Sequence, residues 1–303
     1  MNKDIMQFAI IGPTASGKSD LAIKLAKQLN AYILSIDSLS IYKDIDIISA
    51  KPTAGELEQI KHFGIDILNP DEYFSADIFI NLYNEVFSTC RAQNKNLIIV
   101  GGTSFYLKSL IQGLSLLPNI TKDIALHVES KIKTNLDECY KFLNNIDKQY
   151  MKNISKNDSY RIEKAMLIYE ASKLTPSEWF KLNPAKPIIE NLKVFNIDVD
   201  RNILRERIAA RTSKMMDMGA IDEVCKLEQK YTRLPHSMSS IGIVEILEYL
   251  DGKVTQEQMI ENISIHTAQL AKRQQTFNRT QFDDITHATL EELETLILSK
   301  LNL

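Results

Sequence analysis

The chain has 303 residues, of which 44% are hydrophobic and 25% are charged, and its formal net charge is −3. This composition is that of an ordinary soluble globular protein with one large domain or two small ones, and the net charge gives no global sign of nucleic-acid binding. No stretch approaches the roughly 18 consecutive apolar residues that a membrane-spanning helix needs, so we expect no membrane association. The first apolar run leads directly into a glycine loop, which indicates a structural strand rather than a secretory signal and predicts a cytoplasmic location.

Apolar runs alternate with helical patterns over the first hundred residues. The apolar runs predict buried strands at residues 7–11, 32–36 and 96–100. Leucine and alanine recur at helical spacing after Lys18, and a second helical pattern covers residues 78–91. Strands that alternate with helices form parallel sheets with helices on both faces, so we expect an α/β fold.

The pattern changes at about Pro118. Residues 118–190 show long helical periodicity, many Lys, Asn and Asp residues and little strand signal, which predicts an all-α insertion domain. A strand pattern returns at residues 192–198, and helices are predicted at residues 203–218, 220–231, 242–250 and 256–277. We therefore expect residues 1–117 and 191–303 to form one α/β core that ends in helices.

One segment fits the phosphate-binding pattern G-x-x-x-x-G-K-[ST] in full: Gly12-Pro13-Thr14-Ala15-Ser16-Gly17-Lys18-Ser19. It lies between a predicted strand and a predicted helix, as the pattern requires. Backbone N–H groups of such a loop surround a phosphate, and the helix N-terminus adds partial positive charge. Lys18 supplies a full charge, and the Ser19 hydroxyl is placed to bind Mg²⁺. The segment predicts a bound diphosphate or triphosphate, without naming the reaction.

Asp37 directly follows the second predicted strand, at the edge of the sheet where open α/β folds bind ligands. It fits two chemical roles, a general base or a group near the metal, and Asp-Ser is also a good helix cap. The third predicted strand ends in Gly101-Gly102-Thr103-Ser104 and lacks the acidic residue that a typical phosphate-loop ATPase carries there. The glycines and the Thr103 hydroxyl indicate close approach of a ligand, although a tight turn with a helix cap also explains them.

Two stretches are basic although the chain as a whole is slightly acidic. Residues 201–214 hold five Lys or Arg and one acid, and residues 266–281 hold three Lys or Arg and no acid. Such stripes either bind phosphates or form solvated helix faces.

The three cysteines are Cys90, Cys139 and Cys225. They form no CxxC pair and have no histidine at metal-binding spacing, so we expect buried thiols in a reducing compartment, without a disulfide or a structural zinc ion.

Together these motifs resemble one family, the bacterial tRNA dimethylallyltransferases, which prenylate an adenine beside the anticodon. The matching segments are collinear and span nearly the whole chain: GPTASGKS (12–19), IDSLSIYKDIDIISAKP (36–52), DILNPDEYFSADIF (66–79), IIVGGTSFYLKSLIQGLSLLP (98–118), NDSYRIEKAMLIYEASK (157–173), NILRERIAARTSKMMDMGAIDEV (202–224) and QLAKRQQTFNR (269–279). The phosphate loop, the IDS…AKP segment and AKRQ are specific in combination, because a generic kinase shares only the first.

The resemblance implies transfer of a dimethylallyl group from dimethylallyl diphosphate to N6 of an adenine next to the anticodon, in tRNAs that read codons starting with U. Asp37 matches the family's general base, which takes a proton from the weakly nucleophilic N6 atom. The leaving diphosphate is expected in the loop of residues 12–19, together with Mg²⁺ on Ser19. Thr103 matches a family residue that contacts the reacting nucleotide, and we count it as catalytic with Asp37.

The resemblance also implies RNA contacts in three parts of the chain, and we expect the protein to act as a monomer. The adenine must leave its stack to react. The residues expected to border the flipped base follow the second and third strands: Asp37, Ser38, Leu39, Ser40 and Thr103. The residues expected to contact the rest of the anticodon stem-loop lie in the insertion domain and the C-terminal helices: Tyr160, Arg161, Lys164, Lys272 and Arg273.

Several positions depart from the family pattern, mostly on the RNA side. Ile48 stands where the family has Gly, and Ser239 stands where it has Gln or Arg. Ile243 and Val244 replace an aromatic and a basic residue. We therefore expect RNA affinity or specificity to differ from that of the family.

Two other enzyme classes would use the same loop. One is a small-molecule kinase with Asp37 as base, and the other is a prenyltransferase that acts on free adenine nucleotides. The helical insertion and the basic C-terminal helices favour the tRNA-modifying enzyme over both. A non-enzymatic RNA-binding module is disfavoured, because its intact phosphate loop would be idle.

Overall fold

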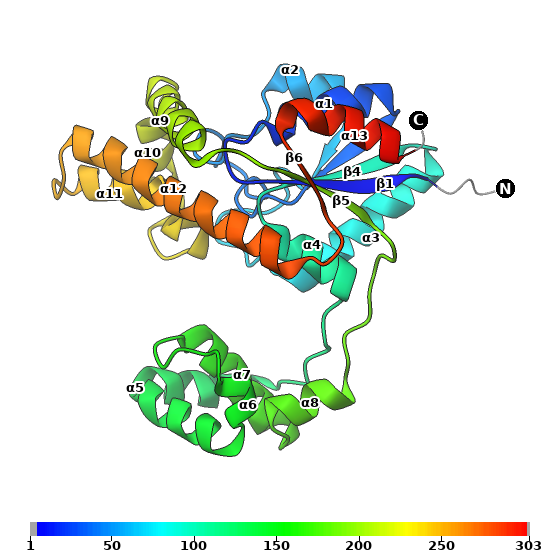
Figure 1. Ribbon diagram of the computed structural model, residues 1–303. Helices are drawn as coiled ribbons and strands as arrows, with labels where there is room; N and C mark the ends of the chain where they lie inside the picture. Colours follow the sequence, from blue (N-terminus) through cyan, green and yellow to red (C-terminus); the bar gives the residue numbers. More distant parts are fainter. Residues whose placement is uncertain (1–4, 302–303) are drawn as a thin grey trace. The chain divides into compact units, whose positions relative to one another are not determined.

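The computed structural model describes residues 5–301, and its chain forms two compact units (Figure 1). The smaller unit spans residues 112–188, and the larger unit combines the chain on either side of it. The smaller unit begins six residues before the position that the sequence predicts, because the segment that precedes Pro118 bonds to the helical unit. In particular, Trp179 Nε1 donates a hydrogen bond of 2.8 Å to the Leu116 carbonyl.

A six-stranded parallel sheet forms the centre of the larger unit, in the order β3-β2-β4-β1-β5-β6. The strands are β1 (Gln7–Ile11), β2 (Ala31–Ser35), β3 (His62–Phe63), β4 (Asn96–Gly101), β5 (Lys193–Ile197) and β6 (Thr286–Ala288). The four predicted strands agree with the structure to within one residue at each end. The two strands that the sequence did not predict, β3 and β6, lie at the edges and have only two and three residues, too few for a periodic pattern.

Helices cover both faces of the sheet, so the α/β prediction is confirmed (Figure 1). Helices α1 (Lys18–Gln28) and α13 (Leu290–Lys300) pack on one face. Helices α3 (Ala76–Ala92) and α4 (Ser104–Gln112) pack on the other. Successive residues of β1 alternate between the two cores: Phe8 and Ile10 in the first, Ala9 and Ile11 in the second. This two-residue alternation with both faces buried explains why the strand is a continuous apolar run.

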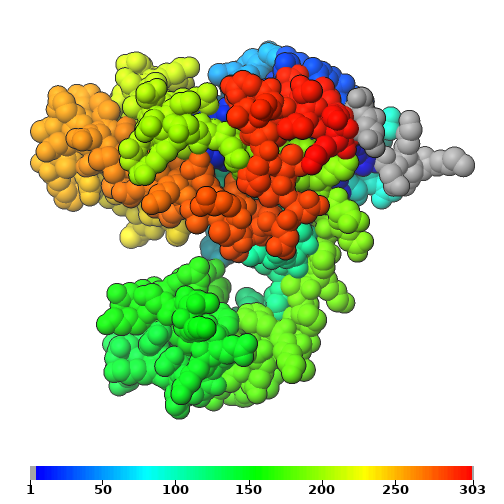
Figure 2. Space-filling model, viewed as in Figure 1, coloured from blue at the N-terminus to red at the C-terminus, as the bar shows by residue number. Residues whose placement is uncertain are grey.

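Helices α9 (Arg201–Asp217), α10 (Ala220–Tyr231), α11 (Ile243–Leu250) and α12 (Gln256–Gln281) lie beyond the carboxyl edge of the sheet (Figure 1). The short helix α2 (Ala54–Gln59) instead lies beside α1, where Lys27 Nζ donates to Gln59 Oε1 at 2.5 Å. Helices α9 and α12 lie side by side at the surface (Figure 2). A third apolar cluster joins α9–α12 to the segment that follows β2, through buried residues such as Ile41, Ile45 and Met259.

The smaller unit is all-helical, with its own apolar core around Val128, Leu143 and Ile162. Its helices are α5 (Lys122–Ile146), α6 (Lys148–Met151), α7 (Ser159–Ser172) and α8 (Pro176–Leu182). Helix α5 is kinked at Asn135, whose φ and ψ of −154° and 75° are not helical. The Asn135 side chain accepts a hydrogen bond from the Glu138 N–H, so it caps the second half of the helix.

Cys90 and Cys139 are buried, as expected, but Cys225 is exposed. The prediction is wrong for Cys225 because α10 buries the face that carries Ala220, Val224 and Leu227, and Cys225 follows that face by one residue. Between residues 5 and 301, no helix is both long and apolar enough to cross a membrane.

Candidate active site

The phosphate loop joins β1 to α1 and has the backbone that its sequence predicts. Gly17 has a φ of 87°, in the left-handed region that favours glycine, and Ala15 also has a positive φ of 64°. The Ser16 N–H donates to the Pro13 carbonyl at 3.3 Å. Lys18 and Ser19 are the first two residues of α1, so the end of the loop coincides with the positive end of the helix. The predicted residues 12–19 therefore lie together around one helix N-terminus.

Lys18 is held against its own loop. Its Nζ donates to the Pro13 carbonyl at 3.1 Å. Burial lowers its pKa to about 8, an effect that the nearby carboxylate of Asp37 opposes and the guanidinium of Arg211 strengthens. A phosphate oxygen can replace the Pro13 carbonyl as the acceptor of this N–H group. The loop thus presents a cation whose charge changes close to neutral pH.

Asp37 follows β2 in a hydrogen-bonded turn rather than at a helix N-terminus. Its Oδ1 accepts the N–H groups of Leu39 at 2.9 Å and Ser40 at 3.2 Å. Within residues 5–301, Oδ2 makes no hydrogen bond, and it is the oxygen that remains available to a ligand. The turn fixes the carboxylate direction, as a general base requires.

Thr103 is bonded directly to the Asp37 turn. Its N–H donates to the Ile36 carbonyl at 3.2 Å, and its Oγ1 accepts the Ser38 N–H at 3.1 Å. The predicted pair Asp37 and Thr103 therefore belongs to one hydrogen-bonded unit at the carboxyl ends of β2 and β4.

Packing within the protein explains the two glycines before Thr103. A Cβ on Gly101 would lie 2.8 Å from Ile36 Cγ1, and a Cβ on Gly102 would lie 2.5 Å from Gln274 Nε2. Gly101 also faces backbone, with the Ile36 carbonyl carbon 2.9 Å from that Cβ position, so it has no room for a side chain, whereas a side chain at residue 102 would displace the end of Gln274. The groups that closely approach these two glycines are therefore Ile36 and Gln274 of the protein itself. No bound ligand is needed to explain the glycines.

The segment between Ile36 and Pro52 has little regular structure, and two charged side chains hold it in place. Lys51 is almost fully buried, and its Nζ bonds to the Tyr42 carbonyl at 2.7 Å and to the carboxylates of Asp46 and Asp66. From α10, the Glu223 carboxylate accepts three successive backbone N–H groups, those of residues 46, 47 and 48, at 3.0, 2.7 and 3.0 Å. These bonds replace the secondary structure that the segment lacks.

Arg211 is a site residue that the sequence analysis did not single out. It lies on α9, burial lowers its pKa, and the Asp37 carboxylate opposes this shift. Arg211 lines the same cleft as Lys18 and Asp37. The basic composition of residues 201–214 indicated that this segment could contact a phosphate. It did not indicate which of the five basic residues lies in the cleft.

The cleft at this edge of the sheet has a volume of about 80 Å³ and is polar. Besides Lys18, Asp37 and Arg211, it is lined by Thr14, Ser19, Ile33, Ser35, Ser40, Ser49, Ala50, Pro52, His62, Ile65, Val100 and Gly101. His62, whose Nδ1 lies 2.8 Å from the Ile60 carbonyl oxygen, has its pKa lowered by burial. The cleft therefore places a loop that can bind an anionic leaving group beside a carboxylate.

The loop is suited to Mg²⁺ held jointly with a phosphorylated substrate. Ser19 is exposed at the start of α1, where its hydroxyl can serve as one ligand. The described part of the chain contains no cluster of three or more His, Cys, Asp or Glu side chains that could hold a metal by itself. Mg²⁺ commonly keeps several waters and takes most other ligands from phosphate oxygens. The donor set therefore fits Mg²⁺ that arrives with a diphosphate.

The predicted RNA contacts are divided between the two units. Tyr160, Arg161 and Lys164 lie on α7 of the helical unit, where Lys164 Nζ sits 5.6 Å from the centre of the Tyr160 ring and Arg161 pairs with Asp158. Tyr160 and Arg161 are exposed.

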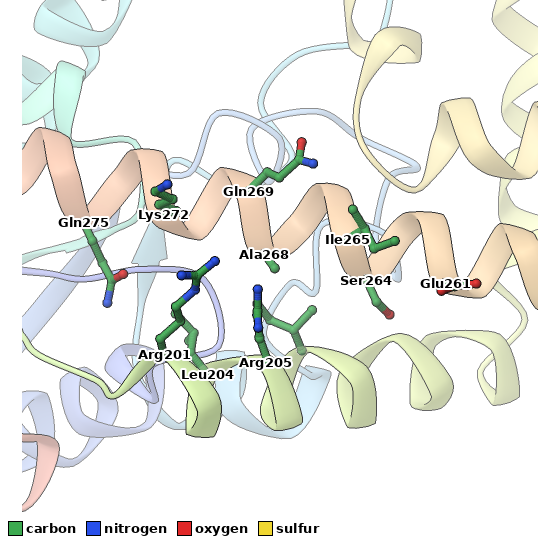
Figure 3. Close-up of a pocket in the computed structure, with 11 residues that line it drawn as sticks. Arg201, Leu204, Arg205, Glu261, Ser264, Ile265, Ala268, Gln269, Lys272 and Gln275 are labelled. Carbon is green, nitrogen blue, oxygen red and sulfur yellow. The ribbon is translucent and has the colours of Figure 1, made fainter.

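Lys272 and Arg273 are exposed on α12 of the larger unit. A second cleft, of about 490 Å³, separates α12 from α9. Arg201 and Arg205 of α9 point into it from one side, and Lys272 borders it on the other (Figure 3). This side of α12 therefore carries positive charge around an apolar floor that includes Leu204.

Two of the residues that depart from the family pattern have side chains buried in the apolar core. Ile48 and Ile243 are both buried in the apolar cluster of α9–α12. A Cβ on Gly242, whose φ is 95°, would lie 3.1 Å from Ile48, so Ile48 covers this glycine. Val244 is exposed, and the Ser239 hydroxyl bonds to the His236 carbonyl. The two isoleucines thus add apolar contact between the segment after β2 and α11.

Comparison with known proteins identifies the family. The model of a family described as IPP transferase matches residues 40–281. A tRNA dimethylallyltransferase of Sulfurimonas denitrificans is 70% identical over 295 residues, which are 97% of this chain and 99% of the relative. The chain belongs to this family. The phosphate loop precedes the range matched by the family model but lies within the length covered by the relative.

Other members agree with this assignment. A tRNA dimethylallyltransferase of a Sulfurovum species is 51% identical over 98% of this chain and 99% of its own length. The crystal structure of a Bacillus halodurans tRNA isopentenylpyrophosphate transferase has a TM-score of 0.72 and 29% identity, covering 99% of this chain and 97% of that one. A eukaryotic dimethylallyltransferase acting on tRNA has a TM-score of 0.81 and 25% identity, covering 98% and 77%. The family and the fold predicted from the sequence are both confirmed.

Proposed function

We propose that this protein transfers a dimethylallyl group from dimethylallyl diphosphate to N6 of an adenine next to the anticodon of tRNA, in tRNAs that read codons starting with U. One observation carries the proposal: a phosphate loop, a carboxylate and a buried arginine line a single cleft in a chain that is 70% identical to a tRNA dimethylallyltransferase. The loop suits the leaving diphosphate, and the carboxylate suits the acceptor.

In the proposed reaction, a bond forms between adenine N6 and the allylic carbon while the bond from that carbon to the diphosphate oxygen breaks. Asp37 takes the N6 proton, because the N6 lone pair is delocalised and becomes nucleophilic as the proton leaves. Its Oδ1 is engaged by the backbone of Leu39 and Ser40, which leaves Oδ2 to accept this proton. Thr103 holds the Asp37 turn and contacts the reacting nucleotide.

Negative charge grows on the diphosphate as the allylic carbon departs. Lys18, Arg211 and the N–H groups of the loop stabilise this charge in a partly buried cleft, where electrostatic interactions are stronger than in water. Mg²⁺ bound by Ser19 and the diphosphate oxygens would neutralise part of the same charge. The positive groups therefore favour the transition state over the bound substrate.

The adenine reaches the cleft only after it leaves its stack in the anticodon loop. Ser38, Leu39 and Ser40 are placed beside Asp37 to border the flipped base. Exposed cations in both units, on α7 and on α12, supply phosphate contacts that hold the stem-loop. We propose that the protein works as a monomer in the cytoplasm.

The test is incubation of the protein with dimethylallyl diphosphate, Mg²⁺ and an anticodon stem-loop that has adenines next to the anticodon, read by mass spectrometry. A gain of one dimethylallyl unit supports the proposal. A gain on free AMP but not on RNA would instead place the protein among nucleotide prenyltransferases. Transfer of phosphate from ATP to a small molecule, without any prenyl transfer, would identify a kinase.

A further inference from the structure

Gln274 of α12 makes hydrogen bonds to two loops of the candidate active site. Its Oε1 accepts the N–H of Thr14 in the phosphate loop at 2.9 Å, and its Nε2 donates to the Gly102 carbonyl at 3.1 Å. Both polar atoms of one amide are thus used, in the orientation that the donor N–H and the acceptor carbonyl require.

The two loops need such a connection because their strands no longer hold them together. Strands β1 and β4 pair as far as Ile11 and Gly101. Beyond these residues the segment after β1 leads into α1, and the segment after β4 leads into α4. The Gln274 amide bonds to both of these segments. Gly102 has no side chain at the point where a Cβ would lie 2.5 Å from Gln274 Nε2, so the loop is shaped to admit this amide.

The connection extends to the proposed base. Gly102 is followed by Thr103, whose N–H and Oγ1 bond to Ile36 and Ser38 on either side of Asp37. A continuous path of bonds therefore runs from Thr14 through Gln274 and Gly102 to the Asp37 turn. This path connects the loop proposed to bind the leaving diphosphate with the carboxylate proposed to take the proton.

We propose that Gln274 is a positioning residue for the transfer reaction, which holds the phosphate loop and the Asp37–Thr103 unit at the separation that the reaction needs. The inference rests on the proposed function. Gln274 directly follows the exposed Lys272 and Arg273, so the helix that we propose contacts RNA also bonds to the two loops of the candidate active site. A displacement of about 1 Å in such a site can cost a hundredfold in rate.

Gln275 provides a matched control on the same helix. It has the same side chain, it is half-buried as Gln274 is, and its Nε2 donates to the Val199 carbonyl at 3.2 Å. In Figure 3 it points from α12 toward the start of α9, where Arg201 lies, and it bonds to neither catalytic loop. Gln275→Ala therefore removes one hydrogen bond of α12 without disturbing the proposed path.

The experiment compares the full-length wild-type protein with Gln274→Ala, Gln274→Glu and Gln275→Ala. Three quantities are measured for each protein: the single-turnover rate at saturating dimethylallyl diphosphate and stem-loop, the affinity for RNA, and the affinity for inorganic diphosphate. Gln274→Ala should lower the rate by about ten- to a hundredfold and the diphosphate affinity by about fivefold, because the loop is no longer pre-organised. Its RNA affinity should stay within about twofold of wild type, and Gln275→Ala should match wild type throughout.

Gln274→Glu adds a readout that a merely structural role would not give. A protonated carboxyl can donate through one oxygen and accept through the other, which reproduces the two bonds that the amide makes here, whereas the carboxylate cannot donate to the Gly102 carbonyl. The rate of Gln274→Glu relative to wild type should therefore rise as pH falls through the carboxyl pKa. A ratio that is independent of pH, or a Gln274→Ala rate within twofold of that of Gln275→Ala, would overturn the inference.

Failure of the proposed function would be recognised separately. If the wild-type protein transfers no prenyl group to RNA, the proposed function is wrong, and the diphosphate affinities decide the role of Gln274 in holding the loop. Equal affinities in Gln274→Ala and Gln275→Ala would then exclude that role, and a selective loss in Gln274→Ala would retain it.

Discussion

Lys18 makes the affinity for dimethylallyl diphosphate depend on pH. Burial lowers its pKa in the free protein to about 8. With that value, Lys18 is about 90% protonated at pH 7 and about 10% protonated at pH 9. If only the ammonium form binds the diphosphate tightly, the affinity should fall about tenfold between these two pH values. The sign follows from the charge: the positive form exists below the pKa, so binding weakens as pH rises.

Titration calorimetry with dimethylallyl diphosphate and Mg²⁺, in the absence of RNA, measures this dependence. At pH 8 about half of the free protein must take up a proton on binding, so the heat should vary with the ionisation enthalpy of the buffer. Lys18→Arg is the matched control, because arginine stays charged throughout this range. Its affinity should not change between pH 7 and pH 9. A wild-type affinity that is equally flat, with no proton uptake, would refute the assignment of Lys18.

Two further predictions concern the loop after β2 and the basic face of α12. Glu223→Ala leaves three backbone N–H groups without their acceptor and should lower the free energy of unfolding by about 1–3 kcal/mol. The neighbouring Asp222 is exposed, so Asp222→Ala should change this free energy by no more than about 0.5 kcal/mol. Urea unfolding measures both, and equal values would show that the carboxylate does not hold the loop. Lys272→Ala and Arg273→Ala should each weaken stem-loop binding and reduce the slope of log affinity against log salt by roughly one. An unchanged slope would show that these cations face away from the RNA.

The sequence was sufficient to predict the parts of the site that lie in contiguous segments. The phosphate loop needs only eight consecutive residues between a strand and a helix. Asp37 and Thr103 each directly follow a predicted strand or its terminal glycines, and parallel strands bring their carboxyl ends to one edge. Local pattern and sheet topology together therefore place these groups near each other before any side-chain contact is known.

The residues that complete the site depend on contacts that no local pattern contains. Gln274 bonds to residues 260 and 172 positions away, and Glu223 caps a loop about 175 positions away. Arg211 shares a helix with four other basic residues, and only the packing of α9 decides which one is buried near Asp37. Gly101 and Gly102 illustrate the same limit, because their neighbours are Ile36, which directly follows β2, and Gln274 of α12, rather than a ligand.

The most direct test of the proposed function compares wild type with Asp37→Asn in a single-turnover reaction on an anticodon stem-loop, with the product sequenced by tandem mass spectrometry. We expect the wild-type protein to place one dimethylallyl group on N6 of the adenine next to the anticodon. Asp37→Asn should bind both substrates with nearly unchanged affinity and react about 10²- to 10⁴-fold more slowly, the usual contribution of a general base. Transfer to a different atom or nucleotide, or a variant that reacts at the wild-type rate, would contradict the account.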